Sequence, residues 1–128
     1  MTAFRPWDVV KVPFPYTDRP VRQHRPALVI AAGAIEAAHG LLWVLMITSA
    51  ENRRWNDDVA VSDLDRTGLP APSVIRCAKV ATIEARDAER IGALAQSDRK
   101  KAASYLTRIL TAVLQSTASP RQGRRAER

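Results

Sequence analysis

Short apolar runs separated by polar loops dominate the first two thirds of the sequence. Leu41 to Ile47 is seven apolar residues in a row, and Ala27 to Ala32 is a second continuous run. Runs of this length are too short for a buried helix and are typical of strands that are covered on both faces. Val9 to Val12 is β-branched apart from Lys11, and Pro13 ends this segment, which predicts a further strand. The N-terminal part of the chain is therefore expected to form a sheet.

Later segments extend this pattern. Val59 to Ser62 and Ser73 to Val80 are expected to add strands, and Thr82 to Glu84 a short edge strand. Polar turn segments such as Asp65 to Pro72 separate them. Strands that follow one another through short connections favour an antiparallel sheet, and a small, partly open barrel is the expected form.

The last third of the chain has the periodicity of helices. Asp87 is placed to cap a short helix through Leu94, and Ser97 or Asp98 to cap a longer one. In the longer helix apolar residues recur at intervals of three and four, namely Ala102, Tyr105, Leu106, Ile109, Leu110, Val113 and Leu114. This amphipathic helix is expected to lie on the sheet or to cap one end of the barrel. The predicted fold class is α+β and mainly β.

The chain of 128 residues is long enough for one domain. We expect that domain to span residues 1–116, followed by a basic, disordered tail over residues 117–128. The net charge is +7; residues 119–128 hold four arginines against one glutamate, which leaves +4 for the rest of the chain. A surplus of this size indicates an anionic partner such as nucleic acid.

Several kinds of chemistry have no basis in the sequence. The single cysteine, Cys77, cannot form an internal disulfide, and it is expected to be a packing residue. His24, His39 and Cys77 lack the spacing of metal ligands, and no glycine-rich phosphate loop is present. The sequence therefore predicts neither a metal site nor a cofactor. It contains no signal-peptide pattern and no apolar run of the ~20 residues that span a membrane, so a cytoplasmic protein without membrane contact is expected.

Cleavage of RNA does not require a nucleophile from the protein, because the ribose 2′-hydroxyl is itself the nucleophile. The protein has to align that hydroxyl, stabilise charge on the phosphate and move two protons. Arg25 could bind phosphate through its planar fork, and Pro26 holds it in extended geometry. Thr48 and Ser49 follow directly after an apolar run, so their hydroxyls should emerge at the end of a strand. Arg76 lies within a predicted strand.

Each of these residues also has an ordinary structural interpretation. An arginine after a loop is often a surface anchor, hydroxyls at strand ends often form turns, and a strand arginine is often solvated. Two loops could flank an RNA groove. Both offer basic side chains to phosphates, and the second adds a ring for base stacking or for packing on its own barrel or dimer mate. The residues concerned are Arg19, Arg22 and His24 in the first loop and Arg53, Arg54 and Trp55 in the second.

Three segments, in order along the chain, resemble the MazF/PemK family of endoribonuclease toxins from type II toxin–antitoxin systems. The first is Trp7–Asp18 with Arg25–Ile30, the second is Leu45–Ser49, and the third is Gly68–Glu84. This resemblance implies an SH3-like barrel with a C-terminal helix, usually dimeric through one sheet surface. It also implies neutralisation by a small antitoxin whose acidic segment occupies the basic groove.

The resemblance also implies roles for single residues. Arg25 matches the family's acid/base and phosphate-binding arginine, Thr48 matches the threonine that supports the scissile phosphate, and Ser49 is its neighbour. Arg76 matches a second arginine that donates a proton in PemK-type members. The chain departs from that pattern at Ala78, where those members carry an acidic residue. The base that accepts the 2′-hydroxyl proton is therefore unassigned, and the candidates are Asp18, Glu51 and His24.

Together these observations predict a metal-independent endoribonuclease toxin that cleaves single-stranded RNA or mRNA. The expected products carry a 2′,3′-cyclic phosphate and a 5′-hydroxyl. Two other interpretations stay open: an RNA-binding module of the same fold with little or no catalysis, and a topoisomerase-poisoning toxin of related fold.

Overall fold

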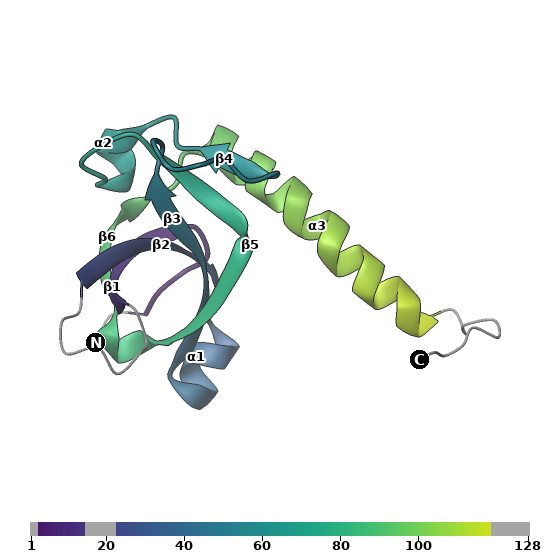
Figure 1. Cartoon of the computed structure of the whole chain (residues 1–128). Coiled ribbons are helices and arrows are strands. Elements are labelled where there is room, and N and C mark those ends of the chain that lie inside the picture. Colours follow the sequence, from purple (N-terminus) through teal and green to yellow (C-terminus); the bar gives the residue numbers. More distant parts are fainter. Residues whose placement is uncertain (1–2, 15–22, 119–128) are drawn as a thin grey trace.

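The structure, a computed structural model, describes residues 3–14 and 23–118 and has a mainly β fold with a C-terminal helix (Figure 1). In this part of the chain six antiparallel strands form one sheet in the order β4-β5-β3-β2-β1-β6. The sheet curls around itself without closing, since β4 and β6 are its two edges. The α+β, partly open architecture predicted above is confirmed. The strands are β1 (Asp8–Phe14), β2 (Gln23–Ala31), β3 (Leu41–Ser49), β4 (Asp58–Ala60), β5 (Ser73–Glu84) and β6 (Glu89–Ala93).

The strands follow the apolar runs, with differences at their ends. The segment expected as a separate edge strand, Thr82–Glu84, continues the twelve-residue strand β5 without a break. The helical turn between β2 and β3 is α1 (Ala34–His39), and η1 (Ala85–Asp87) is one turn of 3₁₀-helix. No helix in the described part of the chain is long and apolar enough to cross a membrane.

The short helix expected over residues 87–94 is wrong. Residues Glu89–Ala93 form β6, which pairs antiparallel with β1. Asp87 as a possible helix cap favoured a helix, but the open edge of β1 offers backbone hydrogen bonds that only an extended partner can use. Gly92 then lets β6 approach a neighbouring helix, because a Cβ there would lie 2.4 Å from backbone atoms of Thr67.

That neighbour is α2 (Leu64–Thr67), a single turn that the sequence pattern did not predict. The Asp63 side chain caps it by accepting a hydrogen bond from the Arg66 N–H at 3.0 Å. Gly68 ends it in the left-handed region at φ 76°.

Buried residues form two clusters, one on each face of the curved sheet. Consecutive strand residues point to opposite faces, and Val44 and Leu45 accordingly belong to different clusters. The cluster that contains Leu45 also takes in α2, β4 and the beginning of α3 (Gln96–Ala118), where Ala102 is fully buried. We call this cluster the outer core.

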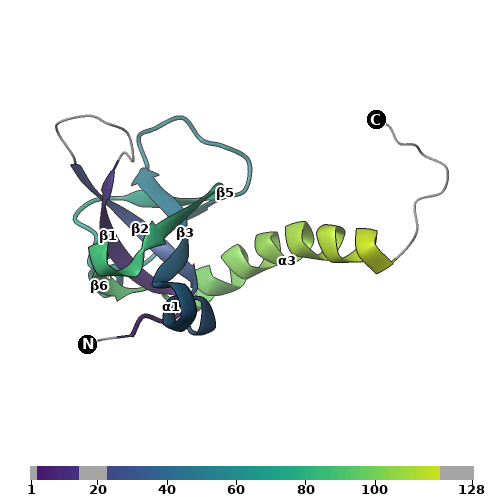
Figure 2. The ribbon, with the colours of Figure 1, turned by 90° about the horizontal axis from the view of Figure 1, so that it is seen from below.

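Helix α3 packs on the sheet only by its first turns. The Asp98 carboxylate accepts hydrogen bonds from the backbone N–H and the hydroxyl of Ser62, both at 2.9 Å, which fixes the direction of the helix. From Thr107 to Thr117 every residue is exposed, and the helix extends away from the barrel (Figures 1 and 2). The expectation that the whole helix would cover the sheet or cap the barrel is therefore wrong for its second half. The helix runs on through Ala118, and the rest of the predicted tail lies outside the described residues.

Candidate functional site

A pocket of about 280 Å³ opens at one end of the barrel, and both Arg25 and Thr48 line it. The sheet register explains why they meet. Ala27 pairs with Met46 in the antiparallel β2–β3 ladder, so two residues further toward this end of each strand come Arg25 and Thr48. The segments 69–73 and Ser49 complete much of the wall.

Arg25 presents its guanidinium at the surface of the pocket. The residue is exposed, and it pairs across the ladder with Val12 of β1. Its Nη2 donates a hydrogen bond to Gln23 Oε1 at 3.3 Å, which engages one of five N–H groups. A guanidinium placed in this way can donate paired hydrogen bonds to a phosphate.

Thr48 is half-buried, and a turn that folds back over the end of β3 orients its hydroxyl. The Asn52 side-chain amide donates to Thr48 Oγ1 at 2.5 Å. Because this hydroxyl oxygen already accepts a hydrogen bond, its own proton must point to another acceptor. The turn is tightened by Asn52 N, which donates to Ser49 O at 3.1 Å, and by Glu51 N, which donates to Ser49 Oγ at 3.1 Å.

Asn52 was not among the predicted site residues, although it lines the pocket. The only signal in the sequence is its place four residues after Thr48 in a polar turn, where asparagine is common for conformational reasons alone. The contact between the two side chains appears only when the turn is seen in three dimensions.

Arg76, the third predicted catalytic residue, is held in a buried cluster and does not line this pocket. Its side chain is 10% exposed and forms an ion pair with Asp58 at 3.1 Å. The same guanidinium donates to the Arg53 carbonyl at 2.7 Å and stacks over the Trp55 ring at 4.3 Å from the centroid. Asp58 in turn accepts a hydrogen bond from Trp55 N at 2.9 Å. Arg76 therefore anchors the loop that leads away from the pocket.

The other predicted RNA contacts fall into two groups. His24 in β2 and the loop residues Arg53, Arg54 and Trp55 are exposed, and Trp55 is 37% exposed although Arg76 stacks on its ring. Arg19 and Arg22 lie outside the described residues, as does the candidate base Asp18.

No carboxylate or imidazole lines the pocket in the part of the chain that the structure describes. Glu51 is exposed on the neighbouring turn. Among residues 3–14 and 23–118, no three His, Cys, Asp or Glu side chains are grouped as metal ligands. The described pocket thus supplies donors for a phosphate but no evident proton acceptor.

Cys77 lies outside the pocket and is 1% exposed in the outer core. Burial, followed by the charges of Asp58 and Asp57, raises the pKa of its thiol to about 11. A thiol that stays protonated at neutral pH is a poor nucleophile. This agrees with the packing role that the sequence predicted for Cys77.

Comparison with known sequences adds two findings. A family described as PemK-like, MazF-like toxin of type II toxin–antitoxin system matches residues 5–110. No curated protein sequence matches the chain significantly.

Among solved structures, MazF from Deinococcus radiodurans superposes with a TM-score of 0.68 at 18% identity, covering 87% of this chain and 99% of that one. The Mycobacterium tuberculosis toxin MazF-mt6 gives 0.60 at 24%, covering 84% and 97%. An endoribonuclease from a mycobacterial species, in complex with its cognate antitoxin, gives 0.64 at 15%, covering 83% and 93%. At these identities the likeness establishes a shared fold.

Proposed function

The chain belongs to the family of PemK-like, MazF-like toxins of type II toxin–antitoxin systems, and on this premise we propose that it is an endoribonuclease that cuts single-stranded RNA. The observation that carries the proposal is the shared pocket of Arg25 and Thr48 at one end of the barrel. A guanidinium and a hydroxyl in one small pocket can both donate hydrogen bonds to the same phosphate group.

In the proposed reaction the 2′-hydroxyl of one nucleotide attacks the adjacent phosphorus. A new bond forms between O2′ and phosphorus while the bond from phosphorus to O5′ breaks. The 2′-hydroxyl proton passes to a base, and a proton is delivered to the departing O5′. The products are a 2′,3′-cyclic phosphate and a 5′-hydroxyl, and the reaction consumes no water and no cofactor.

Arg25 and Thr48 would act on the phosphate oxygens, where negative charge grows in the transition state. A guanidinium stays protonated at neutral pH, so electrostatic stabilisation suits Arg25 better than proton abstraction. Because Asn52 donates a hydrogen bond to Thr48 Oγ1, the hydroxyl proton of Thr48 points away from the loop. Thr48 would donate this proton to a phosphate oxygen. The ion pair of Arg76 with Asp58 favours a positioning role for Arg76 over donation of a proton to the leaving group.

The proposed RNA contacts and partners follow from the charge of the chain. Ser49, His24, Arg53 and Arg54 would hold the strand beside the scissile phosphate, with Arg19 and Arg22 on the neighbouring loop, and Trp55 would stack on a base. We further propose that an acidic antitoxin competes for this basic surface, that the toxin acts in the cytoplasm, and that it works as a homodimer. The net charge of +7 is in keeping with anionic partners of both kinds.

The decisive experiment incubates purified protein with single-stranded RNA in the presence of a chelator and maps both ends of every fragment. New ends with a 2′,3′-cyclic phosphate and a 5′-hydroxyl are expected. Arg25→Ala should lower the cleavage rate by about 100–1000-fold, because one donor to the transition state is lost. Arg86→Ala is the matched control, since it removes the same charge from an exposed residue paired with Glu84. Cleavage by Arg25→Ala at the rate of the control would contradict the proposal.

A second candidate function is RNA binding without cleavage. The observation in its favour is that the described pocket lining contains no carboxylate or imidazole to act as base, together with Ala78 in place of the family's acidic residue. Salt-sensitive RNA association that produces no new 5′ ends in the same experiment would favour this function.

A further inference from the structure

A further pocket, of about 400 Å³, lies where β1 begins, at the opposite end of that strand from the Arg25 pair, and three arginines line it. Arg5 comes from the segment before β1, Arg90 from β6 and Arg99 from the first turns of α3. In the part of the chain that the structure describes, Asp8 is the one carboxylate in its lining, so three positive charges against one negative charge leave +2. We call this site the arginine pocket. Like charges gathered around one pocket repel one another, and an anion between them removes that repulsion.

The carboxylate of Asp8 fixes two of these arginines. Asp8 is 5% exposed. Its Oδ1 accepts a hydrogen bond from Arg90 Nε at 3.0 Å, and its Oδ2 accepts one from the backbone N–H of Arg5 at 2.9 Å. Neither bond uses the terminal Nη groups of Arg90 or the guanidinium of Arg5. The buried acid therefore holds both residues at the pocket through atoms other than those that would bind a ligand.

Arg99 is joined to the same framework through the backbone. Its Nε donates a hydrogen bond to the Leu94 carbonyl at 2.8 Å, and Leu94 N donates to the Trp7 carbonyl at 3.0 Å. As with Arg90, the bond uses Nε and not the Nη groups. An arginine fixed through Nε loses little further freedom when its planar fork of Nη donors binds a ligand.

The turn over residues 5–8, which carries Arg5, has a strained backbone. Asp8 N donates to the Arg5 carbonyl at 3.1 Å and closes the turn. Trp7 is its third residue and has φ 78°, in the left-handed region, where such turns usually have glycine. Strain of this kind persists where the surrounding structure holds it, and it is typical of binding sites. Here the Trp7 side chain packs against the outer core, so the turn is held rigidly beside the pocket.

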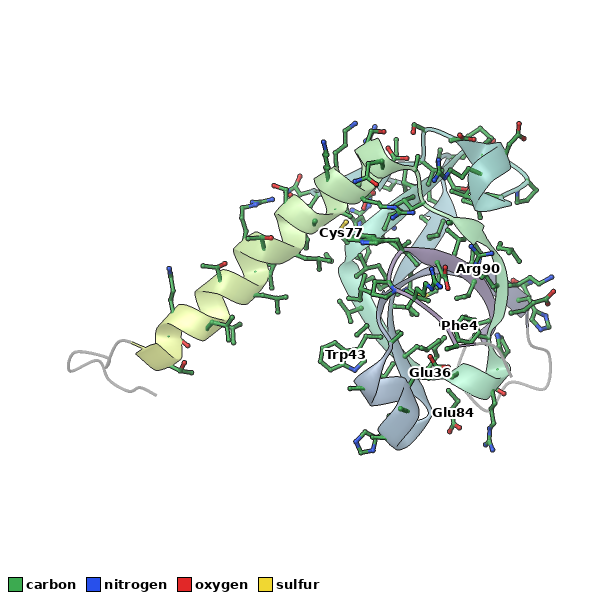
Figure 3. All side chains as sticks on the ribbon, turned by 180° about the vertical axis from the view of Figure 1, so that it is seen from behind. Phe4, Glu36, Trp43, Cys77, Glu84 and Arg90 are labelled. Atoms are coloured by element: carbon green, nitrogen blue, oxygen red, sulfur yellow. The ribbon has the colours of Figure 1, made fainter. Side chains whose placement is uncertain are left out.

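Arg90 also lines a larger hollow, of about 760 Å³, that does not suit an anion. The carboxylates of Glu36 and Glu84 line that hollow together with Phe4. Figure 3 shows Phe4 and Glu36 together on the α1 side of Arg90. Two carboxylates repel a negatively charged ligand. An anion that pairs with Arg90 is therefore expected on the side of the arginine pocket.

We propose that the arginine pocket binds a phosphate dianion, either free phosphate or the terminal phosphate of a small monoester such as a nucleoside monophosphate. A terminal phosphate carries up to two negative charges at neutral pH, which matches the net charge of +2 in the lining. A phosphodiester of RNA carries only one. The paired donors of arginine fit phosphate oxygens, and the volume is within the range of about 300–1,000 Å³ for small-molecule sites. The pocket shares no lining residue with that of Arg25 and Thr48.

Isothermal titration calorimetry at constant ionic strength tests the proposal, with inorganic phosphate and adenosine monophosphate as separate probes. Every sample carries Arg25→Ala, so that phosphate bound in the other pocket does not contribute. One saturable site per chain is expected. Tighter binding of adenosine monophosphate would assign the site to a monoester, and an affinity no better than that of phosphate would assign it to free phosphate. No saturable binding of either probe would overturn the proposal.

Arg5→Gln and Arg99→Gln each remove one positive charge from the pocket and leave the ion pair of Arg90 with Asp8 intact. Each should weaken binding by about tenfold or more, because a hydrogen bond between charged groups is lost. Arg86→Gln is the matched control, since Arg86 is an exposed arginine outside this lining, and it should bind as before. Affinities in both variants equal to that of the control would contradict the proposal. Since binding is the readout, these outcomes are independent of whether the chain cleaves RNA.

Discussion

The hydroxyl of Thr48 illustrates how a single hydrogen bond can define a chemical role. As an isolated residue at the end of β3, its proton could turn toward several acceptors. The amide of Asn52, 2.5 Å from Oγ1, takes one lone pair of the oxygen. The proton is then available for an acceptor on the pocket side, which is what a phosphate oxygen would be in the proposed function.

Two substitutions of Asn52 distinguish this orientation from simple packing. Asn52→Ala removes the donor and should lower the rate of RNA cleavage by roughly tenfold, the worth of a typical hydrogen bond. Asn52→Asp should be slower still, because a carboxylate would accept the Thr48 proton and would also repel the phosphate. Single-turnover cleavage rates measure both effects, and Glu84→Gln is the control, because Glu84 is an exposed acid that does not line the pocket. Equal rates for the Ala and Asp variants would argue against the orientation.

Which of these residues could be predicted depended on how far apart their partners lie in the sequence. Arg25 and Thr48 each stand next to an apolar run, so the local pattern placed both at strand ends, and the family resemblance then suggested their roles. The ion pair of Arg76 with Asp58 joins two strands through a register that no local pattern reveals. For that reason the sequence suggested a catalytic role for Arg76 but not its buried partner.

Among the elements, the loop between β3 and β4 depends most on a single cluster. Arg76 on β5 reaches across to Asp58 at the start of β4, to the Arg53 carbonyl and to the Trp55 ring. Asp58 holds the same loop through Trp55 N. The cluster thus fixes the loop that begins at Asn52 and Ser49 beside the pocket.

Breaking this cluster should destabilise the fold. Arg76→Gln leaves the carboxylate of Asp58, whose side chain is 1% exposed, without its cation, and about 3–5 kcal/mol of unfolding free energy should be lost. Arg108→Ala breaks the exposed pair with Asp57 and should cost no more than about 1 kcal/mol. Urea denaturation of both variants measures the difference. Similar losses in the two would show that the buried cluster contributes no more than a surface pair.

The strands and helices also show where the apolar pattern of the sequence fails to predict secondary structure. Apolar runs located β2, β3 and β5, because a strand that is buried on both faces consists of apolar residues at consecutive positions. The segment Glu89–Ala93 has no such mark, and its pairing with β1 decided its structure. Helix α3 was correctly predicted as amphipathic, but the pattern could not tell which apolar residues meet the sheet and which stay exposed.

For the whole molecule, the outer core joins parts that are remote in sequence. It brings together β1, β2, β3, β5 and the beginning of α3 around Cys77. Water reaches the thiol of Cys77 only when this core opens. Its ionisation is therefore coupled to the unfolding of the molecule.

This coupling predicts how stability depends on pH. Below pH 9 the thiol is protonated in both states. Between pH 9 and about 11 the unfolded chain loses the proton, from an ordinary pKa of 9.0, whereas the folded protein keeps it because its pKa is about 11. The unfolding free energy should therefore fall by about 2–3 kcal/mol across this window. Chemical denaturation at each pH measures it, with Cys77→Ala as the reference. An equal decline in the variant would assign the effect to other groups.

Local sequence patterns were enough to predict the fold class, the strands with continuous apolar runs and the family, and they suggested the ends of β2 and β3 as the place for a phosphate site, which stays a prediction. These features depend on residues that are neighbours in the chain, or on a motif that keeps its order. The three-dimensional contacts were needed to show that Arg25 and Thr48 share a pocket, that Asn52 donates to the Thr48 hydroxyl, that Arg76 pairs with Asp58 and that the described residues leave half of α3 exposed. Each of these is a contact between distant segments, set by strand register and helix direction, and a one-dimensional pattern carries neither.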